Sequence, residues 1–351
     1  MLYDVLVVGA GPAGSSAASE AAKHGAKVLM IEKRKVIGQP VQCAEFIPKF
    51  LLDELEITNN SIVQKIRGIK TYLPSGECFK LNSPGYMLNR SIFDKELAAG
   101  AAKKGVDIFI NTLCVSKEKG KIVINKNGRQ MKILPKVIIG ADGPKSTVGE
   151  WINSTNKDFM IGLQYELPLI TPLDHTEIYF DYDFFGGYGW LFPKENSANV
   201  GIGIRYNPES KTNKSLSSIL KKFVNVLEKD GKVKNSIVSI NSGLIPVGGP
   251  LHTVKDNLML VGDAAGQTHP ITGGGISQAV ICGKIAGRIS ARAIQEGNMG
   301  VLTEYEDEWQ GIFGKELKRA QTKRQFLEYH WDKLDVIVKK CWVAFREYYH
   351  E

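Results

Sequence analysis

The chain has 351 residues, of which 43% are hydrophobic and 23% are charged. These fractions are typical of a globular protein, so they exclude disordered, collagen-like and coiled-coil chains, and the length predicts two domains or one domain with a large insertion. Lysine and arginine total 45 against 37 aspartate and glutamate residues, for a net charge of +8. This excess favours anionic partners, although a lysine-rich solvated surface explains it equally well.

The motifs that the sequence lacks narrow the class of protein. It has no zinc-finger spacing, arginine-rich arm or RNP motif, so we expect no nucleic-acid partner. The five cysteines never form a CxxC pair and the six histidines are not clustered, so we expect no disulfide framework and no metal site. Without a leader sequence or an apolar stretch of about 20 residues, we expect a cytoplasmic protein, with contact with the membrane surface left open.

The first part of the chain alternates between buried strands and helices. Residues 4–8 predict a strand, 13–23 an alanine-rich helix and 27–32 a second strand, which together form a β-α-β unit with parallel strands. An antiparallel hairpin is predicted over 66–81, because residues 74–76 form a Pro-Ser-Gly turn within it. A helix and two strands follow at 93–104, 106–110 and 137–139.

The second part of the chain is richer in β-formers and aromatic residues. Three segments alternate like strands of an antiparallel sheet, at 176–185, 188–193 and 199–206. A lysine-rich amphipathic helix is predicted at 215–229. A buried strand at 257–261 and a helix from 275 to about 296 restore the earlier pattern, and the residues after 302 are expected to be helical.

The sequence GAGPAG at 9–14 lies between the predicted first strand and first helix. In such a fingerprint Gly9 allows a tight turn, Gly11 lets a pyrophosphate approach the backbone, and Gly14 lets the helix pack against the sheet. Glu32 ends the second strand, where a carboxylate can accept hydrogen bonds from ribose hydroxyls. A carboxylate there disfavours a 2′-phosphate, so the nucleotide is predicted to be FAD or NAD.

A second glycine-rich cluster distinguishes between these two nucleotides. Gly262 and Asp263 follow a predicted strand, and the glycines at 273–275 open a helix at Ile276. Asp263 can bond a ribityl hydroxyl, and the positive end of the helix can stabilise negative charge on a reduced flavin. Nicotinamide enzymes have no need for this second element, so the cluster indicates FAD.

These motifs together resemble those of the para-hydroxybenzoate-hydroxylase-like FAD oxidoreductases, and within them those of the geranylgeranyl reductases, which saturate isoprenoid chains. The resemblance runs from Met1 to about Gln295. The motifs that carry it are GAGPAG at 9–14, EKR at 32–34, VQCAE at 41–45, NRxxFD at 89–94, GADG at 140–143, YGWLFP at 188–193, ANVGIG at 198–203 and GDAAGQTHPITGGGI at 262–276.

The resemblance implies an α/β fold and three regions. A Rossmann-like FAD-binding domain is expected to be discontinuous, over 1–60, 88–152 and 243–302. An antiparallel-sheet domain for the isoprenoid substrate is expected over 61–87 and 153–242, and a helical C-terminal region over 303–351. Aromatic residues of that last region either lie at a membrane interface or form a helical cap over the core.

The resemblance also implies the site residues, with FAD bound noncovalently. The expected FAD contacts are Gly9, Gly11, Pro12, Ala13, Gly14, Glu32, Lys33, Cys43, Ala44, Arg90, Asp142, Gly262, Asp263, Gly274, Gly275 and Ile276. Arg90 is interpreted as a charge partner of the pyrophosphate or as an exposed cation at a helix start.

Two further interpretations concern the substrate. Tyr188, Trp190 and Phe192 alternate along one strand, so they either line an isoprenoid tunnel or pack in an ordinary core. The family places Cys43 beside the flavin ring, where its thiol either takes part in catalysis, for example as a proton donor, or packs against the ring.

The predicted function is an FAD-dependent reductase of the CH–CH class, saturating carbon–carbon double bonds of a geranylgeranyl or polyprenyl chain of a lipid or prenylated precursor. The electron donor is NAD(P)H or reduced ferredoxin. One alternative is an FAD monooxygenase or halogenase of an aromatic substrate, which the glycine at 149 disfavours because hydroxylases commonly carry arginine there. Another is an electron-transfer flavoprotein acting on a quinone, which the absence of cluster-binding cysteines disfavours.

Overall fold

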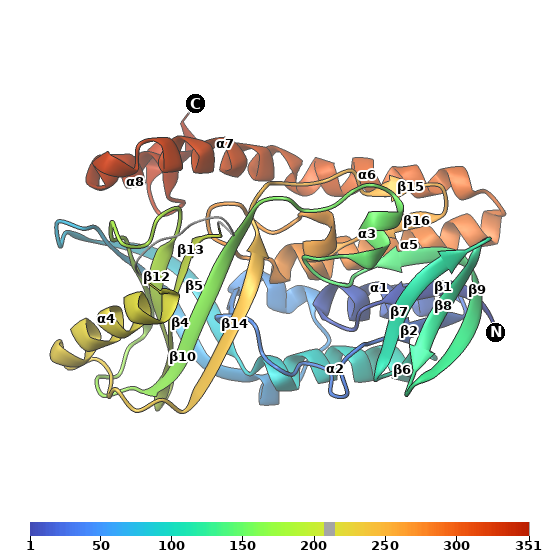
Figure 1. Ribbon diagram of the computed structural model, residues 1–351, viewed down its shortest axis with the longest axis horizontal. Coiled ribbons are helices and arrows are strands. Elements are labelled where there is room, and N and C mark those ends of the chain that lie inside the picture. Colours follow the sequence, from blue (N-terminus) through green and yellow to red (C-terminus); the bar gives the residue numbers. More distant parts are fainter. Residues whose placement is uncertain (207–214, 351) are drawn as a thin grey trace.

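The computed structural model describes residues 1–206 and 215–350, and in it two sheets lie side by side with helices between and above them (Figure 1). Residues 207–214 of the predicted substrate domain and residue 351 of the C-terminal region lie outside the described residues. Among the helices described, none has the length and apolar character needed to cross a bilayer.

The first sheet forms around the buried strand at the start of the chain. β1 (Leu2–Val8) pairs in parallel with β2 (Val28–Ile31) on one side and with β9 (Arg129–Gly140) on the other. β6 (Asp107–Phe109) and β16 (Leu258–Leu260) extend this parallel core. Such strands are covered on both faces, which explains their continuous apolar runs.

An antiparallel extension completes the first sheet. It consists of β7 (Thr112–Glu118) and β8 (Lys121–Lys126), which continue from β9, and the short β15 (Val254–Lys255) beside β16. α3 (Thr147–Trp151) packs on the same side of the sheet as β7 and β8. The predicted Rossmann-like core is therefore present, with an added meander that the sequence analysis did not predict.

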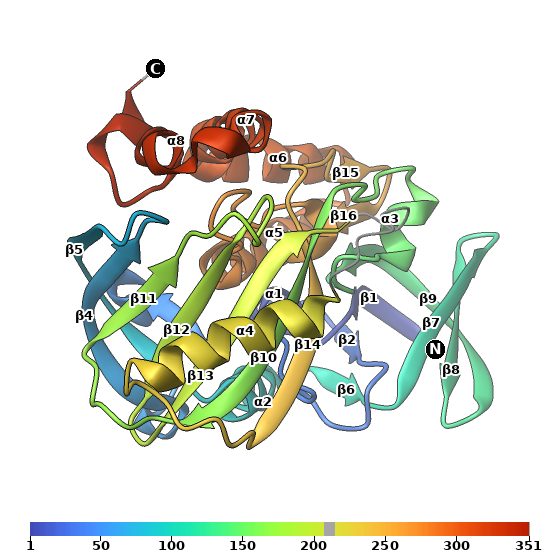
Figure 2. The same ribbon diagram turned by 60° about the vertical axis from the view of Figure 1, so that its left-hand side comes forward.

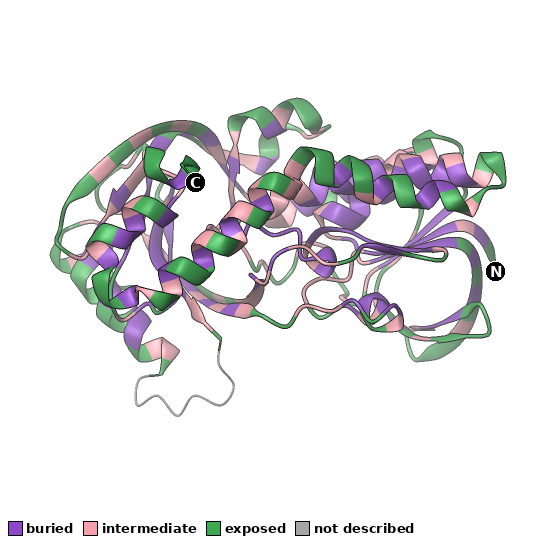
Figure 3. Cartoon of the chain, turned by 90° about the horizontal axis from the view of Figure 1, so that it is seen from above, coloured by how far each residue is buried: buried purple, intermediate pink, exposed green. Residues whose placement is uncertain are grey.

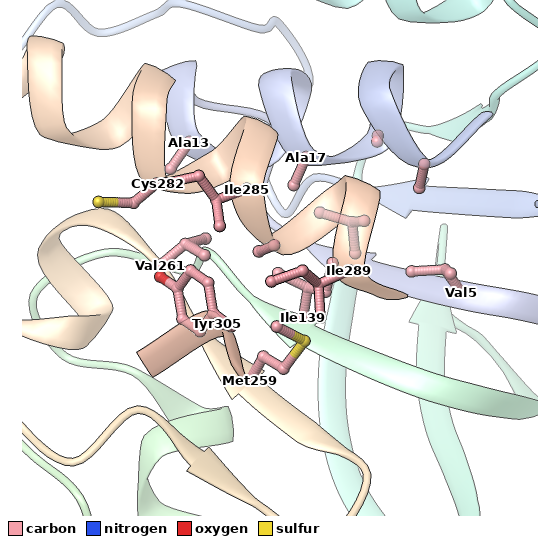
Figure 4. Close-up of a cluster of buried hydrophobic side chains, with 14 of the residues drawn as sticks. Val5, Ala13, Ala17, Ile139, Met259, Val261, Cys282, Ile285, Ile289 and Tyr305 are labelled. Carbon is pink, nitrogen blue, oxygen red and sulfur yellow. The ribbon is translucent and has the colours of Figure 1, made fainter. Parts of the chain in front are cut away.

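Two long helices cover the other face of this sheet, α1 (Pro12–Lys23) and α5 (Ile276–Glu296) (Figure 4). They approach closely because glycines face alanines between them. A Cβ atom at Gly283 would lie 2.4 Å from the carbonyl oxygen of Ala13, and one at Gly287 would lie 2.2 Å from that of Ala17. This contact holds the N-termini of both helices at one end of the sheet.

The second sheet is antiparallel except for one parallel pair, β4 with β11. Its strands, in spatial order, are β14 (Ser239–Pro246), β10 (Phe159–Pro168), β13 (Ser197–Arg205), β12 (Tyr188–Lys194), β11 (His175–Tyr179), β4 (Ile62–Tyr72), β5 (Cys78–Leu88) and β3 (Phe46–Pro48). α4 (Leu216–Lys229) lies across one face (Figure 2) and buries its apolar side there. α2 (Arg90–Lys103) leads from β5 back to the first sheet.

The C-terminal region is a cap over both sheets. α6 (Glu304–Trp309) continues through a π-helical turn into α7 (Lys315–Tyr329), and α8 (Leu334–Cys341) follows. Buried and exposed residues alternate along these helices (Figure 3). Trp309, Trp331 and Trp342 are at most 8% exposed. Of the two interpretations of this region, the helical cap is therefore correct for the tryptophans.

Two sequence predictions need correction. The strand predicted over 176–185 ends at Tyr179, because the Asp181 carboxylate accepts a hydrogen bond from the Asp183 N–H and turns the chain. β3 and the last part of β14 belong to the second sheet, although the predicted domain boundaries assign residues 46–48 and 243–246 to the FAD-binding domain. We keep the discontinuous division as a proposal with this adjustment.

Candidate active site

A cleft of about 590 Å³ lies where β1 ends and α1 begins. Eight of the predicted cofactor residues line it: Gly9, Gly11, Pro12, Glu32, Lys33, Arg90, Asp142 and Asp263. They come from distant parts of the sequence, but parallel strands place their carboxyl ends at one edge of the sheet, where ligands of such folds bind. The sequence analysis missed other lining residues, among them Thr112 and Lys145.

The N-terminus of α1 lies at this cleft and leaves backbone N–H groups free for a ligand. α2, α3 and α4 each have a side-chain N-cap, from Asn89, Ser146 and Ser215. α1 and α5 follow Gly11 and Gly275 and have no side-chain cap, and Gly11 lines this cleft. An ideal Cβ at Gly11 meets nothing within 4 Å, so an anionic group can approach the backbone there. These features fit a dinucleotide phosphate.

The Glu32 carboxylate is fixed by two backbone hydrogen bonds. Its Oε2 accepts from the N–H of Ala10 at 3.0 Å, and its Oε1 accepts from the N–H of Arg34 at 2.9 Å. A carboxylate has about four acceptor positions, so two remain for ribose hydroxyls. Glu32 thus both orders the loops around the cleft and faces into it.

The two aspartates of the cleft differ in their partners. Asp142 accepts bonds from the Ser146 hydroxyl at 2.5 Å and the Thr147 N–H at 2.7 Å, so its carboxylate orders the start of α3. Asp263 accepts one bond, from Thr268 Oγ1 at 2.6 Å. Burial raises the pKa of Asp263 above its usual value, and the Thr268 hydrogen bond and the Arg90 charge offset only part of this rise. Asp263 therefore retains more acceptor capacity for a ligand than Asp142.

Arg90 is not the exposed cation of the alternative interpretation. Its side chain is 13% exposed and makes a bidentate ion pair with Asp94, with N–O distances of 2.9 and 3.1 Å. Burial disfavours the charged form, but the Asp94 carboxylate outweighs it and raises the pKa of Arg90. Arg90 is therefore a permanent buried cation on the wall of the cleft.

Two glycines of the predicted set lie behind the cleft and shape it. A Cβ atom at Gly14 would lie 1.9 Å from the carbonyl oxygen of Gly9, so this residue permits the turn and the helix to pack together. The N–H of Gly262 donates to Gln267 Oε1 at 2.7 Å, and a Cβ atom at Gly262 would lie 3.0 Å from that of Ala13.

A second, larger cavity of about 750 Å³ adjoins the cleft, since residues such as Gly11, Arg90 and Asp263 line both. The remaining predicted cofactor residues lie on its wall: Ala13, Cys43, Ala44, Gly274, Gly275 and Ile276. The first turn of α5 therefore opens into this cavity. If FAD occupied the cleft, these residues would be the ones available to hold its ring.

The strand β12 supplies an aromatic wall of this cavity. Tyr188, Trp190 and Phe192 line it, while Leu191 packs against α4 on the other face of the sheet. The predicted alternation along this strand is thus confirmed. Two hydrogen bonds fix the wall, from the Tyr188 hydroxyl to the carbonyl oxygen of Thr272, and from Trp190 Nε1 to Gln164 Oε1 at 2.8 Å.

The cap supplies a further wall of the cavity, which the sequence analysis did not assign. Phe313, Glu316, Trp342, Val343 and Tyr349 all line the cavity. They belong to helices and turns without a recognisable motif. The one sequence signal was the concentration of aromatic residues after 302, and it did not specify which residues face inward.

A buried arginine attaches this cap to the rest of the site. The Arg324 guanidinium on α7 donates to the carbonyl oxygens of Pro270 at 2.9 Å and Gly186 at 2.7 Å. Pro270 lies in the loop before α5, and Gly186 lies just before β12. One side chain therefore links the cap, the glycine-rich loop and the aromatic strand.

Cys43 lies on the cavity wall with donors around its sulfur. The N–H of Glu45 is 3.2 Å from Sγ. Burial raises the pKa of the Cys43 thiol, and the Arg90 charge and the Glu45 N–H oppose this shift. The thiol is thus protonated at neutral pH, with two groups that stabilise the thiolate once a proton has left.

Comparisons with family models match three parts of the chain. A model described as FAD dependent oxidoreductase matches residues 4–44, and one described as geranylgeranyl reductase catalytic domain matches residues 158–245. A third, described as lycopene cyclase protein, matches residues 210–335. The second match includes the aromatic strand.

Curated relatives extend over most of the chain. A digeranylgeranylglycerophospholipid reductase of Methanococcus vannielii is 39% identical over 324 residues, covering 88% of this chain and 82% of the relative. Reductases of the same name from Methanocaldococcus jannaschii and Methanosarcina acetivorans are 37% and 38% identical, covering 93% and 99% of this chain and 87% and 86% of the relatives.

Solved structures share the fold. A geranylgeranyl bacteriochlorophyll reductase-like protein of Thermoplasma acidophilum is 32% identical, with a TM-score of 0.84 over 97% of this chain and 96% of that one. A flavin-dependent brominase is 19% identical, with a TM-score of 0.75 over 97% of this chain and 90% of that one, and shows likeness of fold alone.

Proposed function

The chain belongs to the geranylgeranyl reductase family of FAD-dependent oxidoreductases, and on that premise we propose that it reduces the geranylgeranyl chains of a digeranylgeranylglycerophospholipid. The observation that carries this proposal is the aromatic cavity of about 750 Å³ that adjoins the nucleotide cleft. A cavity with aromatic walls suits a flexible hydrocarbon chain, and it adjoins the cleft that would hold FAD.

Residues of the cleft hold the cofactor in this proposal. Glu32 accepts from the adenosine ribose, the uncapped start of α1 and the Arg90 cation face the pyrophosphate, and Asp263 accepts from the ribityl chain. When bound, FAD supplies the hydride that saturates one carbon of the double bond. The protein contributes position and electrostatics.

The cavity walls orient the isoprenoid and exclude water. Tyr188, Trp190 and Trp342 line the cavity and would contact the chain, and burying its surface contributes about 25 cal/mol per Å². Holding the double bond in one orientation removes the entropy cost of bringing it to the cofactor. The cap therefore acts as part of the active site.

The proton for the second carbon comes, in this proposal, from Cys43. An unactivated alkene has no carbonyl to accept charge, so a proton must reach one carbon as the hydride reaches the other. The Cys43 S–H bond breaks and its proton forms the new C–H bond; after the reduced chain has left the cavity, water returns a proton to the sulfur. The Glu45 N–H and the Arg90 guanidinium stabilise the transient thiolate.

The rim of the cavity suggests how a membrane lipid enters. Phe50 and Tyr349 line the cavity and are 57% and 53% exposed. Exposed aromatic residues partition into the headgroup region of a bilayer, and a net charge of +8 attracts anionic lipids. We propose peripheral contact with the membrane at this rim, with NAD(P)H or reduced ferredoxin as the electron donor.

The test is anaerobic reduction of a purified digeranylgeranylglycerophospholipid, followed by mass spectrometry of the lipid. We expect a mass gain in steps of one H₂ per reduced bond. Cys43→Ser exchanges one atom of the cavity wall, so we expect it to retain FAD, which its absorbance checks, and to slow reduction by roughly 10²–10⁴-fold, the usual contribution of a general acid. Unchanged lipid mass with the reduced holoenzyme contradicts the proposed substrate, and full activity of Cys43→Ser contradicts the proposed proton donor.

A further inference from the structure

Glu45 is a buried carboxylate on the wall of the substrate cavity, two residues after Cys43. Its residue exposure is 3%, and its backbone has a φ of +73°. A non-glycine residue rarely adopts this left-handed conformation, so other contacts must hold it there. The mechanism proposed above uses the N–H of Glu45 but gives its side chain no role.

The Glu45 carboxylate connects three elements. Oε2 accepts from Lys194 Nζ at 2.6 Å, at the end of β12, and from Asn199 Nδ2 at 2.8 Å, on β13. Oε1 accepts from the N–H of Arg90 at 2.8 Å, at the start of α2. The side chains of Lys194 and Glu45 are 12% and 4% exposed, so this ion pair is largely withdrawn from solvent.

The same elements hold the rest of the short loop. Asn199 Nδ2 also donates to the carbonyl oxygen of Ala44 at 3.2 Å, and Gln164 Nε2 donates to that of Cys43 at 3.3 Å. Both carbonyl oxygens and the carboxylate are therefore attached to the antiparallel sheet. With the backbone fixed in this way, the N–H of Glu45 points at Cys43 Sγ.

We infer that Glu45 is the positioning residue for the Cys43 thiol: its ion-paired carboxylate fixes the loop and the start of α2, so that the Glu45 N–H and the Arg90 guanidinium both face the sulfur. The inference rests on the proposed function only in that the thiol is the proton donor. It gives a role to the VQCAE motif, in which the cysteine and the glutamate are two residues apart.

The arrangement predicts how charge at Glu45 affects the thiol. The charged and titratable groups that act on Cys43 are Arg90, Glu45 and Tyr188, and Lys194 neutralises Glu45. Removing the carboxylate charge leaves Lys194 as an unpaired buried cation, which favours the thiolate. Removing the lysine leaves an unpaired carboxylate, which disfavours the thiolate. The two substitutions must therefore shift the titration of Cys43 in opposite directions.

The experiment measures the pH dependence of Cys43 alkylation by iodoacetamide in the FAD-bound protein, quantified for each cysteine by mass spectrometry. Glu45→Gln is expected to move the Cys43 profile to lower pH by at least about half a unit, and Lys194→Met to higher pH by a similar amount. The double variant Glu45→Gln/Lys194→Met restores neutrality but lacks the ion pair that fixes the loop, so its Cys43 profile is expected to lie at higher pH than that of the wild type; a return to the wild-type profile would show that the pair acts through its charge alone and overturn the positioning role.

Glu177 provides a matched control on the same sheet. It is 1% exposed, and its Oε2 accepts from Lys232 Nζ at 2.6 Å. Unlike Thr176 and Ile178, it does not line the cavity. Glu177→Gln therefore removes a buried, lysine-paired carboxylate of the same type away from Cys43, and it is expected to leave the Cys43 profile unchanged.

The outcomes separate this inference from the proposed function. Shifts of the same sign in the two single variants, no shift in either, or an equal shift in Glu177→Gln overturns the inference. If Glu45→Gln fails to fold, Lys194→Met still tests the inference: a shift of the Cys43 profile to higher pH supports it, and a shift to lower pH overturns it. The titration needs no lipid, so a protein that does not reduce the lipid can still give the expected shifts, and an active reductase can fail to give them.

Discussion

The nucleotide cleft and the substrate cavity adjoin each other but are built in different ways. The cleft is formed by short motifs at strand ends, where glycines and free backbone N–H groups face the space proposed for the cofactor. The cavity is formed by residues that extend from Gly11 to Tyr349 along the chain and come from the second sheet, from α1 and α5, from connecting loops and from the cap. Substitutions in the cleft should therefore affect cofactor affinity, and substitutions in the cavity should affect which bonds are reduced.

Two glycine substitutions test this contrast with the largest expected effect. Gly14→Ala places a methyl group 1.9 Å from the backbone oxygen of Gly9, so the fingerprint turn cannot persist. We expect loss of FAD and a destabilisation of roughly 3 kcal/mol or more. Gly162→Ala, on the cavity wall, places its methyl 3.6 Å from Ile245 Cδ1 and 3.7 Å from Trp190 Cη2, which is ordinary contact.

Gly162→Ala is thus expected to fold and bind FAD normally while narrowing the cavity. The measurements are FAD content from the absorbance of the purified protein and the thermal midpoint of each variant. Normal FAD content in Gly14→Ala, or its loss in Gly162→Ala, contradicts the division between cleft and cavity.

Glu32→Ala tests the contribution of one cleft residue to FAD affinity. The variant loses the acceptor proposed for the ribose and the bonds to the Ala10 and Arg34 N–H groups. We expect FAD affinity to fall by about 1–3 kcal/mol, the range for charge-assisted hydrogen bonds. Fluorescence titration of apoprotein with FAD measures this, with Glu20→Ala on α1 as the control because Glu20 pairs only with exposed residues among the contacts described. Full affinity in Glu32→Ala removes Glu32 from the site.

Trp190→Ala tests whether the cavity wall determines which double bonds are reduced. The substitution removes wall area beside the substrate, so we expect a changed distribution of partly reduced lipids with FAD binding nearly unaltered. Leu191→Val on the opposite face of β12 is the control, since it packs against α4 and should cost about 1 kcal/mol in stability without altering products. The measurement is the product distribution of each variant, resolved by the number of added hydrogens. The same pattern and turnover in Trp190→Ala would show that these aromatics are core packing.

The smallest expected effect is in the cap. Glu316 accepts from the Tyr348 hydroxyl at 2.7 Å and from Arg319 Nη1 at 2.6 Å. Burial raises the pKa of Glu316, but the bonds from His269 and Tyr348 and the Arg319 charge outweigh it, so the pKa lies below its usual value. A lowered pKa stabilises the folded state above the unfolded pKa of about 4.3, and this stabilisation is lost as the pH falls.

Glu316→Gln should therefore reduce stability by about 0.5–1 kcal/mol at pH 7, after screening by solvent, and by progressively less as the pH falls toward about 4. Urea unfolding between these pH values measures the difference, and Glu304→Gln in the same region is the control. A difference that does not change with pH contradicts the role of the Glu316 charge.

The sequence by itself determined the elements whose signals are local. The β-α-β unit, the fingerprint at 9–14, the glycine-rich segment before α5 and the alternation of β12 follow from spacing within a few residues, and the structure contains them at the predicted places. The end of β11 was missed because Asp181 forms a turn with its own neighbours, which strand-forming residues around it concealed.

Only the tertiary structure decided how these elements form one site. The Glu45–Lys194 pair joins residues 149 positions apart, and the Arg324–Gly186 bond joins residues 138 positions apart. The cap faces the cavity because Trp331, Trp342 and Tyr348 bury apolar surface against β11 and β12, which no local pattern specifies. Burial and ion pairing depend on which surfaces meet, so the sequence determined the nucleotide motifs, whereas the packing of the chain determined the substrate cavity and the surroundings of Cys43.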